Sequence, residues 1–451
     1  MTDSKNSLNK KIGIIGLGYV GLPLAVEYAK KGFSVIGFDV DKTKIGMLLE
    51  GNNYIQDVSD EDLRKIVDEK TFTATSDFSF LKETDYIFIC VPTPFSTNKE
   101  PDVSYIEDAT KSIASNLKKG QTIILKSTTY PETTNKVVRP ILEKTGLEVG
   151  QDFHLAFSPE RIDPGRTDFT TTNTPIVLGG VTRECGESAK SIIEQIIPNV
   201  HVVSSPEAAE MTKLLENIFR SVNIALANEL AQLCDRMGNI DFWEVIDAAS
   251  TKPFGFMPFF PGPGIGGHCI LVDPYYLSWK AREFDFHTNF IELAAETNEN
   301  MPYYVYSLLV QALSEHGVPL TTAKVLFLGV SFKKDVDDIR NSPAIKVMEI
   351  LLGKGSSNLI YSDPFVPNLT VKGKTYRSQS LTEEVLRLVD CVIILTAHSD
   401  YDYEFIVENT RLVIDTRNAT KNVKNNRNKI VLLGSGENKD HLAQLDKLRI
   451  A

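Results

Sequence analysis

The sequence predicts an α/β protein in which two Rossmann-like, doubly wound parallel-sheet domains are joined by a central long-helix domain. Three observations predict this fold. Apolar strand-like runs alternate with helical patterns at both ends of the chain, a Gly-x-Gly-x-x-Gly run follows the first strand, and a long apolar helical repeat separates the two alternating regions. We place the domains at residues 1–205, 206–318 and 319–451.

The first domain alternates strands and helices from its start. The alternation begins with a strand (KIGIIGLG), a helix (YVGLPLAVEYAKKG) and a second strand (SVIGFDV). Further buried strands follow as YIFICVPTP, QTIILKSTT, HLAFSPE, PIVLGG and VHVVSS. Strands that are apolar on both faces and separated by helices are typical of a parallel sheet with helices on both sides.

The central domain begins with an unusually long helix. Ser205 and Glu207 are residue types of a helix start, and Gly238 is typical of a helix end. Further helices follow on both sides of a glycine-rich loop. Long apolar helices between sheet domains often form a subunit interface, so we expect a homodimer or higher homo-oligomer; a bracing linker is the alternative. The apolar positions at helical spacing are Met211, Leu214, Leu215, Ile218, Phe219, Val222, Leu226 and Leu230.

The last domain is a second alternating region that starts near residue 320. Its strands are AKVLFLGV, SNLIYSDP, DCVIILTAH, RLVIDTRN and KIVLLG, with NSPAIKVMEILLGKG as a helix. The region lacks Gly-x-Gly-x-x-Gly, so we expect it to bind something other than a dinucleotide, or only to pack.

Composition excludes several classes of protein. A net charge of -11 argues against a nucleic-acid binder, which is usually basic. The polar start MTDSKNSLNK is no signal peptide, and no run is apolar enough to span a bilayer, which predicts a cytoplasmic protein without a membrane partner. The five cysteines are scattered, with no Cys-x-x-Cys pair and no His-x-x-x-His pair, which argues against disulfides and a metal site.

The strongest motif is the glycine run with its acidic partner. Gly16 permits a tight turn, Gly18 lets the backbone approach a pyrophosphate, and Gly21 lets helix and strand pack closely. Asp39 ends the next strand, where a ribose-binding acid is expected, and its carboxylate favours NAD over NADP. Lys44 could touch the adenosine side, although spacing alone favours an ordinary surface lysine.

The candidate reactive group is Cys269, in the glycine- and proline-rich run FFPGPGIGGHC. A cysteine beside an NAD site suggests oxidation beyond the aldehyde. A thiolate can form a thiohemiacetal, a second hydride transfer gives a thioester, and water releases an acid. A small buried side chain is the alternative, and we adopt it for the other cysteines. Those cysteines are Cys90, Cys185, Cys234 and Cys391.

Two further pairings stay open on spacing alone. Lys213 and Asn217 lie four residues apart on the long helix and could hold an oxyanion, but a solvated pair is the simpler interpretation. His268 could lower the pKa of the neighbouring thiol. An ordinary loop histidine fits equally well.

Seven motifs occur in a specific order: GLGYVGLPLA, VPTP, KSTTYP, FSPERIDPGR, TKLLENIFRSVNIALANELA, FPGPGIGGHC and SFKKDVDDIRNSP. In these motifs and their order the chain resembles the UDP-glucose/GDP-mannose dehydrogenase family over almost its full length. The block GGHCILVDPYYLSWKAREFDFHTNFIELAAETNENMP is most similar to the UDP-N-acetylglucosamine 6-dehydrogenase branch, which supplies uronic acids for surface polysaccharide.

The resemblance implies a four-electron oxidation by two NAD+, in which the 6-hydroxymethyl of a UDP-sugar becomes a carboxylate without release of the aldehyde. Cys269 would be the nucleophile. Lys213 and Asn217 would stabilise oxyanions and orient water. Asp273 would help to activate water or support the lysine, and Glu160 would be a general base or acid near the thioester.

The resemblance also implies the binding residues. Thr128 would order a water molecule and touch the cofactor, and Arg340 would reach NAD from the C-terminal domain. The other residues implied at the NAD site are Tyr19, Val20, Asp39, Lys44 and Thr93. The residues implied for the UDP-sugar are Glu160, Arg161, Lys213, Asn217, Pro258, Phe259, Phe260, Pro261, Gly262, Gly266 and Lys333. A lysine and loop amides suit an anionic diphosphate.

One position departs from part of the family. Some UDP-glucose enzymes carry a second acid four residues after the glutamate of the SPE motif. Pro164 stands there in this chain, with Asp163 beside it. The change agrees with an N-acetyl sugar rather than glucose.

The resemblance thus implies an NAD-dependent UDP-sugar 6-dehydrogenase with UDP-N-acetylglucosamine as the preferred substrate. UDP-N-acetylmannosamine, UDP-N-acetylgalactosamine and UDP-glucose are alternatives. A two-electron hydroxyacid dehydrogenase shares the first sheet and a Lys/Asn pair but needs neither the cysteine loop nor the last domain. A non-enzymatic NAD-responsive scaffold is the third hypothesis.

Overall fold

The computed structural model describes residues 10–55, 58–96, 100–162, 169–267 and 269–436, and the chain divides into two compact units. Unit 1 comprises Met1–Glu216 and Tyr275–His287, and unit 2 comprises Asn217–Pro274 and Thr288–Ala451. The helices α8 (Pro206–Met237) and α10 (Cys269–Ala281) each contribute residues to both units. The predicted boundaries of three domains stay a prediction.

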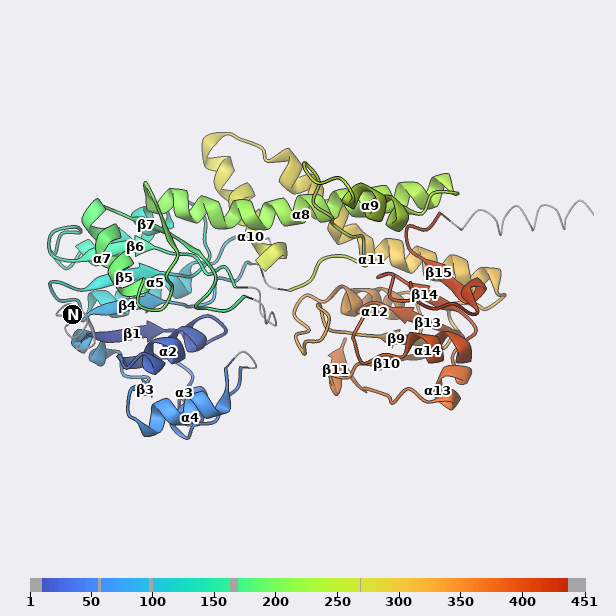
Figure 1. Ribbon diagram of the computed structural model, residues 1–451, viewed down its shortest axis with the longest axis horizontal. Coiled ribbons are helices and arrows are strands. Elements are labelled where there is room, and N and C mark those ends of the chain that lie inside the picture. Colours follow the sequence, from blue (N-terminus) through green and yellow to red (C-terminus); the bar gives the residue numbers. More distant parts are fainter. Residues whose placement is uncertain (1–9, 56–57, 97–99, 163–168, 268, 437–451) are drawn as a thin grey trace, which may run out of the picture. The chain divides into compact units, whose positions relative to one another are not determined.

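Unit 1 contains an eight-stranded sheet in the order β3-β2-β1-β4-β5-β6-β7-β8 (Figure 1, blue to green). All neighbouring strands pair in parallel except β6 and β7, which pair antiparallel. The described residues between β6 and β7 contain no helix, and an antiparallel pair needs no helical crossover. The strands are β1 (Lys11–Ile15), β2 (Ser34–Phe38), β3 (Phe72–Thr75), β4 (Tyr86–Ile89), β5 (Thr122–Leu125), β6 (His154–Phe157), β7 (Ile176–Gly180) and β8 (Val200–Val203).

Helices cover both faces of this sheet because its central strands are apolar on both sides. In β5, Ile124 joins one hydrophobic core, and Ile123 and Leu125 join the other. The first core also contains side chains of α2 (Gly21–Lys30), α3 (Lys42–Leu49), α4 (Asp60–Asp68) and α7 (Arg183–Ile193). The second contains side chains of α5 (Ser104–Ala114), the π-helix η2 (Thr134–Val138) and α6 (Arg139–Glu143). The predicted doubly wound arrangement is confirmed.

Unit 2 contains a five-stranded parallel sheet in the order β10-β9-β13-β14-β15 (Figure 1, orange and red). All five strands correspond to predicted runs. The antiparallel hairpin β11–β12 was not predicted. The strand order reverses between β9 and β13, and such a point is where open α/β sheets bind ligands. The strands are β9 (Val325–Leu328), β10 (Leu359–Ser362), β11 (Asn368–Val371), β12 (Lys374–Arg377), β13 (Cys391–Ile394), β14 (Val413–Asp415) and β15 (Ile430–Leu432).

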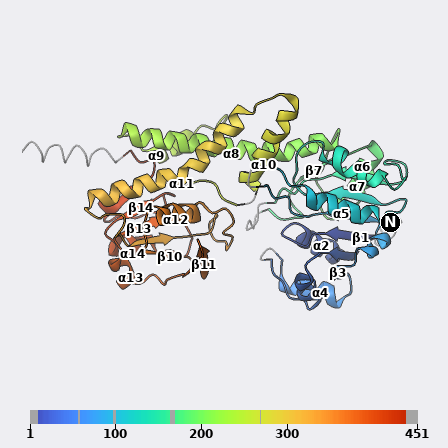
Figure 2. The ribbon, with the colours of Figure 1, turned by 180° about the vertical axis from the view of Figure 1, so that it is seen from behind.

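Helices also cover both faces of the second sheet. Side chains of α11 (Asn289–Glu315), α12 (Pro343–Gly353) and the unit 2 part of α8 share one core with β9 and β13. Figure 2 shows α11 and α12 beside this sheet. The short helices α13 (Glu383–Leu388) and α14 (Tyr403–Asn409) share the other core. The connecting helix α9 (Phe242–Ser250) contributes side chains to both cores.

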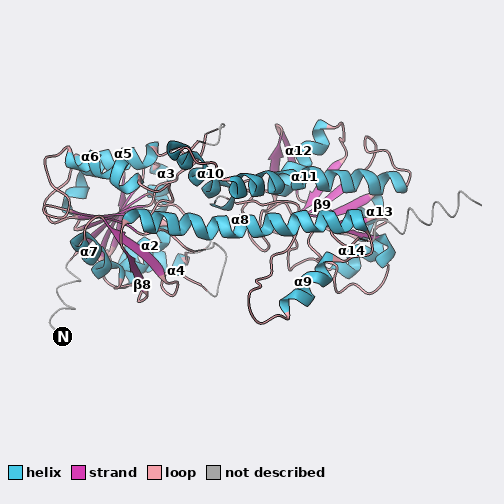
Figure 3. Cartoon of the chain, turned by 90° about the horizontal axis from the view of Figure 1, so that it is seen from above, coloured by secondary structure: helices cyan, strands magenta, loops and turns pink. Residues whose placement is uncertain are grey.

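The long helix α8 leaves a row of apolar side chains exposed. Figure 3 shows α8 as one continuous helix beside α11. Its buried side, with Ala227 and Ala231, packs into the core of unit 2. Large exposed apolar side chains at this density are typical of an interaction surface. The exposed row consists of Met211, Leu215, Phe219, Leu226, Leu233 and Met237.

A buried carboxylate on α8 fixes the end of the second sheet. Asp235 accepts hydrogen bonds from the Tyr304 hydroxyl (2.7 Å) and from the backbone N–H groups of Gly434 (3.0 Å) and Gly436 (3.2 Å). Burial raises the pKa of Asp235, although these hydrogen bonds counteract the effect. The helix is thereby joined to α11 and to the turn that follows β15.

A second buried carboxylate on α8 organises unit 1. Glu210 is fully buried and accepts hydrogen bonds from the backbone N–H groups of Glu132 (2.7 Å) and Thr134 (2.9 Å) and from the Thr134 hydroxyl (2.7 Å). Burial raises the pKa of Glu210 to about 7, although its hydrogen bonds with Thr134 and Glu132 oppose the shift. Glu210 thus fixes the backbone that follows the KSTTYP motif.

We predict that Glu210→Gln changes the pH dependence of stability. A carboxylate whose folded-state pKa is raised above its ordinary value of 4.5 contributes stability below that value, and this contribution is lost as pH rises through about 7. The wild type should therefore lose on the order of 2 kcal/mol of unfolding free energy relative to Glu210→Gln between pH 5 and pH 8. Denaturant unfolding across this range measures the difference. Glu229→Gln, on the exposed side of α8, is the matched control, and a pH-independent difference between wild type and Glu210→Gln would contradict the prediction.

Candidate active site

The glycine run has the geometry that its sequence predicts. Gly16 has φ +90°, and a Cβ there would lie 2.7 Å from the carbonyl oxygen of Cys90. A Cβ at Gly21 would lie 1.9 Å from the carbonyl oxygen of Gly16, so the start of α2 touches the turn. A Cβ at Gly18 would meet nothing within 4 Å, which leaves open space beside the backbone. No side chain caps the described first turn of α2, so its N–H groups can receive phosphate.

Asp39 lies at the carboxyl end of β2 and binds the glycine turn. Its carboxylate accepts hydrogen bonds from the backbone N–H groups of Leu17 and Asp41, each at 3.0 Å. The Tyr54 hydroxyl donates to the Leu17 carbonyl (2.6 Å), and the Lys44 ammonium lies 5.8 Å from the centre of the Tyr54 ring. Asp39 and Lys44 therefore flank the glycine turn. With the open space at Gly18, these residues fit a bound dinucleotide.

Thr93 and Thr128 are joined directly. The Thr93 hydroxyl donates to the Thr128 carbonyl at 2.7 Å, and the Thr93 carbonyl accepts a hydrogen bond from the Tyr276 hydroxyl. Tyr276 is fully buried in the unit 1 part of α10. The loops after β4 and β5 are thus fixed to each other and to α10. Of the other predicted cofactor residues, Val20 is partly buried against the core and Tyr19 is exposed.

Glu160 lies in a positively charged environment in unit 1. Its carboxylate is 3.5 Å from the ammonium of Lys126, which is almost fully buried at the end of β5. Burial favours the neutral form of Glu160, but the charges of Lys126 and Lys213 and the backbone N–H groups of Ile162 and Arg161 outweigh it and lower its pKa. Glu160 is therefore ionised near neutral pH, which suits a base or an electrostatic role better than an acid.

Arg161 forms an ion pair with α8. Its guanidinium donates to both carboxylate oxygens of Glu216 (2.6 and 3.3 Å) and to the Pro175 carbonyl (2.7 Å). Arg161 thereby fixes the loop that carries Glu160. Asp163 and Pro164 lie outside the described residues.

Asn217 and Asp273 contact each other in unit 2. The Asn217 amide donates to the Asp273 carboxylate, and both side chains are buried. Asn217 follows the buried Lys213 by one turn of α8, so the solvated pair considered from spacing is wrong for these two residues. Cys269 is the first residue of α10, and its side chain lies outside what the structure describes, as does His268.

The cysteine loop, residues 258–267, contains most of the predicted substrate residues. Phe259 is half-buried with its ring 5.7 Å from that of Phe219, and Phe260 stacks on Trp243 at 5.9 Å. Pro258 is exposed and Pro261 is buried.

Gly262 in this loop lies against a guanidinium. A Cβ at Gly262 would be 2.6 Å from Nη1 of Arg417, which follows β14. Arg417 donates from Nε to the Leu395 carbonyl (3.0 Å), and no carboxylate among the described residues forms an ion pair with it. Burial lowers the pKa of Arg417 to about 10, only partly offset by Asp415. Such a cation fits an anionic ligand.

A chain of buried amides holds the same glycine. The Gly262 N–H donates to the Asn228 side chain (2.9 Å), and Asn228 donates to Asn298 (2.9 Å). Asn298 donates in turn to the Ser221 carbonyl (3.0 Å). These contacts connect α8, α11 and the cysteine loop, and they fix the backbone beside Arg417.

Lys333 and Arg340 lie on one loop, residues 331–341, between β9 and α12. The Arg340 guanidinium donates to Oδ1 of Asp338 at 3.0 Å and to its Oδ2 at 2.6 Å. The Gly267 N–H donates to the Arg340 carbonyl (3.0 Å), and Asn341 donates to the Gly267 carbonyl (3.1 Å). A Cβ at Gly266 would lie 2.6 Å from Cβ of Phe332. The cysteine loop and the Lys333 loop therefore pack tightly together.

Sequence reasoning missed Lys126, Arg417 and Asn228. Lys126 and Arg417 follow the apolar strands TIIL and VID, and a polar residue at the carboxyl end of a buried parallel strand is a usual ligand position. Asn228 is a buried amide in the long helix. The predicted catalytic residues divide between the units: Thr128, Glu160 and Lys213 belong to unit 1, and Asn217, Cys269 and Asp273 to unit 2.

The described residues offer neither a metal site nor a membrane-spanning helix. They hold no cluster of three or more histidine, cysteine, aspartate or glutamate residues arranged for a metal ion. None of their helices combines the length and apolarity needed to cross a membrane. Cys90, Cys185, Cys234 and Cys391 are buried, as predicted.

The sequence matches three domain profiles of one family. Residues 10–197 match the NAD-binding domain of the UDP-glucose/GDP-mannose dehydrogenase family, residues 207–300 its central domain, and residues 326–422 its UDP-binding domain. NAD is therefore the cofactor.

Relatives and solved structures of the same family agree with these profile matches. The chain is 37% identical over 393 residues to UDP-N-acetyl-D-glucosamine 6-dehydrogenase of Salmonella typhi, covering 87% of this chain and 90% of the relative. It is 34% identical over 417 residues to UDP-N-acetyl-D-mannosamine dehydrogenase of Pyrococcus horikoshii, covering 91% and 96%. It is 34% identical over 421 residues to NDP-N-acetyl-D-galactosaminuronic acid dehydrogenase of Ralstonia nicotianae, covering 90% and 96%. The solved UDP-D-ManNAc dehydrogenase of Pyrococcus horikoshii has a TM-score of 0.85 at 32% identity, covering 95% and 100%. The chain therefore belongs to the UDP-glucose/GDP-mannose dehydrogenase family and is an NAD-dependent UDP-sugar dehydrogenase.

Proposed function

We propose that the enzyme oxidises C6 of a UDP-N-acetylhexosamine, with UDP-N-acetylglucosamine preferred, to the uronic acid. Two relatives at 37–38% identity are UDP-N-acetylglucosamine 6-dehydrogenases, and the sequence around Cys269 is most similar to that branch. The mannosamine and galactosamine epimers are the nearest alternatives, since relatives of both kinds match the chain. The reaction consumes two NAD+ and one water and yields the carboxylate, two NADH and three protons.

The observation that carries the mechanism is the position of Cys269 at the start of α10, directly after a loop packed against Arg417 and the Lys333 loop. A helix N-terminus favours a thiolate over a thiol. Loss of the hydroxyl proton and of a hydride from C6 turns the alcohol into an aldehyde, and the sulfur adds to its carbonyl carbon to give a thiohemiacetal. Loss of a second hydride from C6 then gives a thioester. Water then adds at C6, and the C–S bond breaks to regenerate the thiolate. Bound NAD+ supplies the hydride acceptor for both oxidations.

The other catalytic residues stabilise negative charge, accept a proton or orient these groups and water. Lys213, a buried cation, stabilises the alkoxide and oxyanion at C6, and Asn217 donates an amide hydrogen bond there or to water. Glu160, ionised beside Lys126, accepts a proton from the attacking water. Asp273 orients Asn217 through their hydrogen bond. Thr128, whose carbonyl is bound to Thr93, orders a water molecule beside the cofactor.

The nucleotide part of the substrate is held in unit 2. Arg417 and Lys333 supply positive charge for the diphosphate, and the cysteine loop, including Gly266, supplies backbone amides. In unit 1, Glu160, Arg161 and Lys213 contribute to the sugar site. The glycine turn, Tyr19, Val20, Asp39, Lys44, Thr93 and Thr128 bind NAD, and Arg340 contacts it from unit 2.

The proposal extends to assembly and biological role. The exposed apolar row on α8 supports a homodimer formed by pairing of this helix with a second copy. A uronic acid product suits the synthesis of surface polysaccharide. Location in the cytoplasm stays a prediction from the sequence.

Cys269→Ala should abolish acid formation while leaving NAD binding intact. The loss should be on the order of a thousandfold or more because no thioester can form. Product analysis with a panel of UDP-sugars, together with NAD titration, measures both effects. Cys234→Ala is the matched control, since Cys234 is buried in α8. Full turnover by Cys269→Ala would refute the mechanism.

The same panel separates the remaining hypotheses in the wild type. Two NADH per substrate support the proposed reaction, and one NADH supports a two-electron dehydrogenase. No NADH with any UDP-sugar supports a binding protein.

Lys126→Met should shift the acidic limb of the pH profile of kcat/KM to higher pH. The charge of Lys126 opposes the effect of burial on Glu160, so removal of this charge raises the pKa of the Glu160 carboxylate. The base is then protonated at a higher pH, and activity is lost there. Lys119→Met, an exposed lysine before the same strand, is the control. An unchanged limb would mean that a group other than Glu160 sets it.

Arg417→Gln should raise KM for the UDP-sugar about 10- to 100-fold, because a hydrogen bond to a charged group contributes about 1.5–3 kcal/mol. KM for NAD should stay unchanged. Arg411→Gln, an exposed arginine in the same unit, is the matched control. Steady-state kinetics and titration with UDP measure the effect, and equal UDP affinities for Arg417→Gln and wild type would contradict a contact with the diphosphate.

A further inference from the structure

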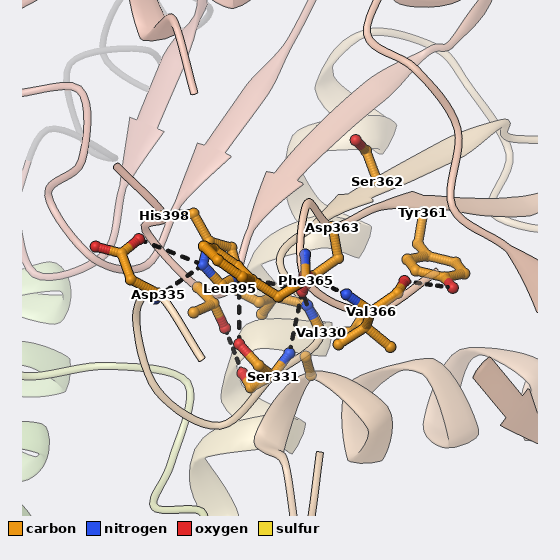
Figure 4. Close-up of polar contacts among 12 residues, drawn as sticks. Val330, Ser331, Asp335, Tyr361, Ser362, Asp363, Phe365, Val366, Leu395 and His398 are labelled. Atoms are coloured by element: carbon orange, nitrogen blue, oxygen red, sulfur yellow. Dashed lines mark hydrogen bonds and ion pairs between the residues drawn. The ribbon is translucent and has the colours of Figure 1, made fainter. Parts of the chain in front are cut away.

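A buried histidine–aspartate pair lies at the carboxyl edge of the second sheet, beyond its central strand β13 and its edge strand β10. Figure 4 shows His398, which follows β13, beside Asp363, which follows β10. Both side chains are 0% exposed, and Nε2 of His398 is 3.1 Å from Oδ2 of Asp363. The rings of Phe365 and Tyr401 pack against the imidazole at 5.1 and 5.6 Å between centroids. The pair occupies the point where the strand order of the sheet reverses.

The hydrogen bonds fix the tautomer of His398. The backbone N–H of Asp335 donates to Nδ1 at 3.0 Å, so Nδ1 carries no proton and the ring N–H is on Nε2. This N–H donates to Asp363, which also accepts from the backbone N–H groups of Val330 (2.7 Å) and Ser331 (3.3 Å). Burial would raise the pKa of Asp363, but the hydrogen bonds with His398 and Val330 lower it, so the carboxylate is ionised.

This pair anchors the Lys333 loop at two points. Asp363 accepts a hydrogen bond from the N–H of Ser331, the first residue of the loop. His398 accepts one from the N–H of Asp335, where the loop bends with φ +59°. Ser399, next to His398, adds two bonds to the Asp335 carboxylate, from its backbone N–H and from its hydroxyl, each at 2.7 Å. The loop between these anchors includes Lys333.

The anchored loop supports the residues before Cys269. Phe332 fills the space beside Gly266 and Gly267, where added Cβ atoms would lie 2.6 and 2.9 Å from its side chain. The carbonyl of Arg340 and the amide of Asn341 bind both backbone groups of Gly267. A contiguous path of contacts thus runs from the His398–Asp363 pair to the residue two positions before the nucleophile.

We propose that His398 and Asp363 are positioning residues that set the Lys333 loop for the UDP moiety and, through Gly266 and Gly267, the backbone that presents Cys269. The inference rests on the proposed roles of Lys333 and Cys269. A histidine that only satisfied buried hydrogen bonds would affect stability without affecting the kinetics of the folded protein.

Two substitutions distinguish the roles of the two ring nitrogens of His398. In His398→Asn, the amide oxygen lies near the place of Nδ1 and can accept the Asp335 N–H. In His398→Gln, the longer amide reaches the place of Nε2 and can donate to Asp363, but the acceptor for Asp335 is lost. Both remove the ring, so both lower the melting temperature. Only His398→Gln releases the bend of the loop.

The measurements are KM for the UDP-sugar, UDP affinity by calorimetry, and the rate of iodoacetamide labelling at Cys269 by peptide mass spectrometry. For His398→Gln we expect about tenfold weaker UDP affinity, a similar rise in KM and a labelling rate changed about threefold or more, as expected for loss of one buried contact. His398→Asn should stay within about threefold of wild type. Thr410→Val, a buried polar residue of unit 2 at the end of α14, is the stability control.

Equal effects of the two His398 variants, or wild-type affinity and labelling in both, would overturn the proposal. If neither variant folds, Ser399→Ala removes one exposed bond to Asp335 and should change KM and labelling in the same direction by a smaller amount, and no change would overturn the proposal. UDP affinity and labelling require no turnover. A Cys269→Ser enzyme that still forms acid would therefore refute the proposed function while leaving this test intact.

Discussion

An aspartate at the carboxyl end of one parallel strand, bound to the backbone N–H groups of the loop after the neighbouring strand, is the interaction on which both units depend. In unit 1, Asp39 after β2 binds the N–H of Leu17 after β1. In unit 2, Asp363 after β10 binds the N–H groups of Val330 and Ser331 after β9. The strand pairs β1–β2 and β9–β10 are both parallel and consecutive, so the two contacts occupy equivalent places.

The two aspartates nevertheless support different chemistry. Asp39 sits beside a glycine turn with open space at Gly18, so a dinucleotide can approach the backbone. Asp363 is covered by His398 and also binds the N–H groups of Phe365 and Val366. A carboxylate with so many partners holds a loop but leaves no room for a ribose. This difference explains why the second sheet, which lacks the glycine motif, has a different ligand.

Much of this arrangement could be predicted because it depends on local pattern. Apolar runs and turn residues indicated every strand of the two main sheets except β3, a short edge strand with alternating polar residues, and the glycine spacing located the turn at Gly16. The antiparallel pairing of β7 and the hairpin β11–β12 were not predicted, since apolar runs carry no strand direction and the hairpin strands are short and half exposed. Lys126 and Arg417 were missed because their importance comes from neighbours distant in sequence, Glu160 and Gly262. The burial of Lys213 likewise depends on tertiary packing that helical spacing does not report.

The contacts of Asp235 have a consequence for the order in which the chain acquires its structure. The carboxylate belongs to the middle of the polypeptide, but two of its partners are the N–H groups of Gly434 and Gly436. Ribosomes synthesise the chain from its N-terminus to its C-terminus, so this part of α8 lacks those partners until almost the whole protein has been translated. A premature stop codon shortly before residue 434 would leave a buried acid with only the Tyr304 hydroxyl among these partners. A protein truncated by a stop codon even this late should be poorly packed and readily degraded.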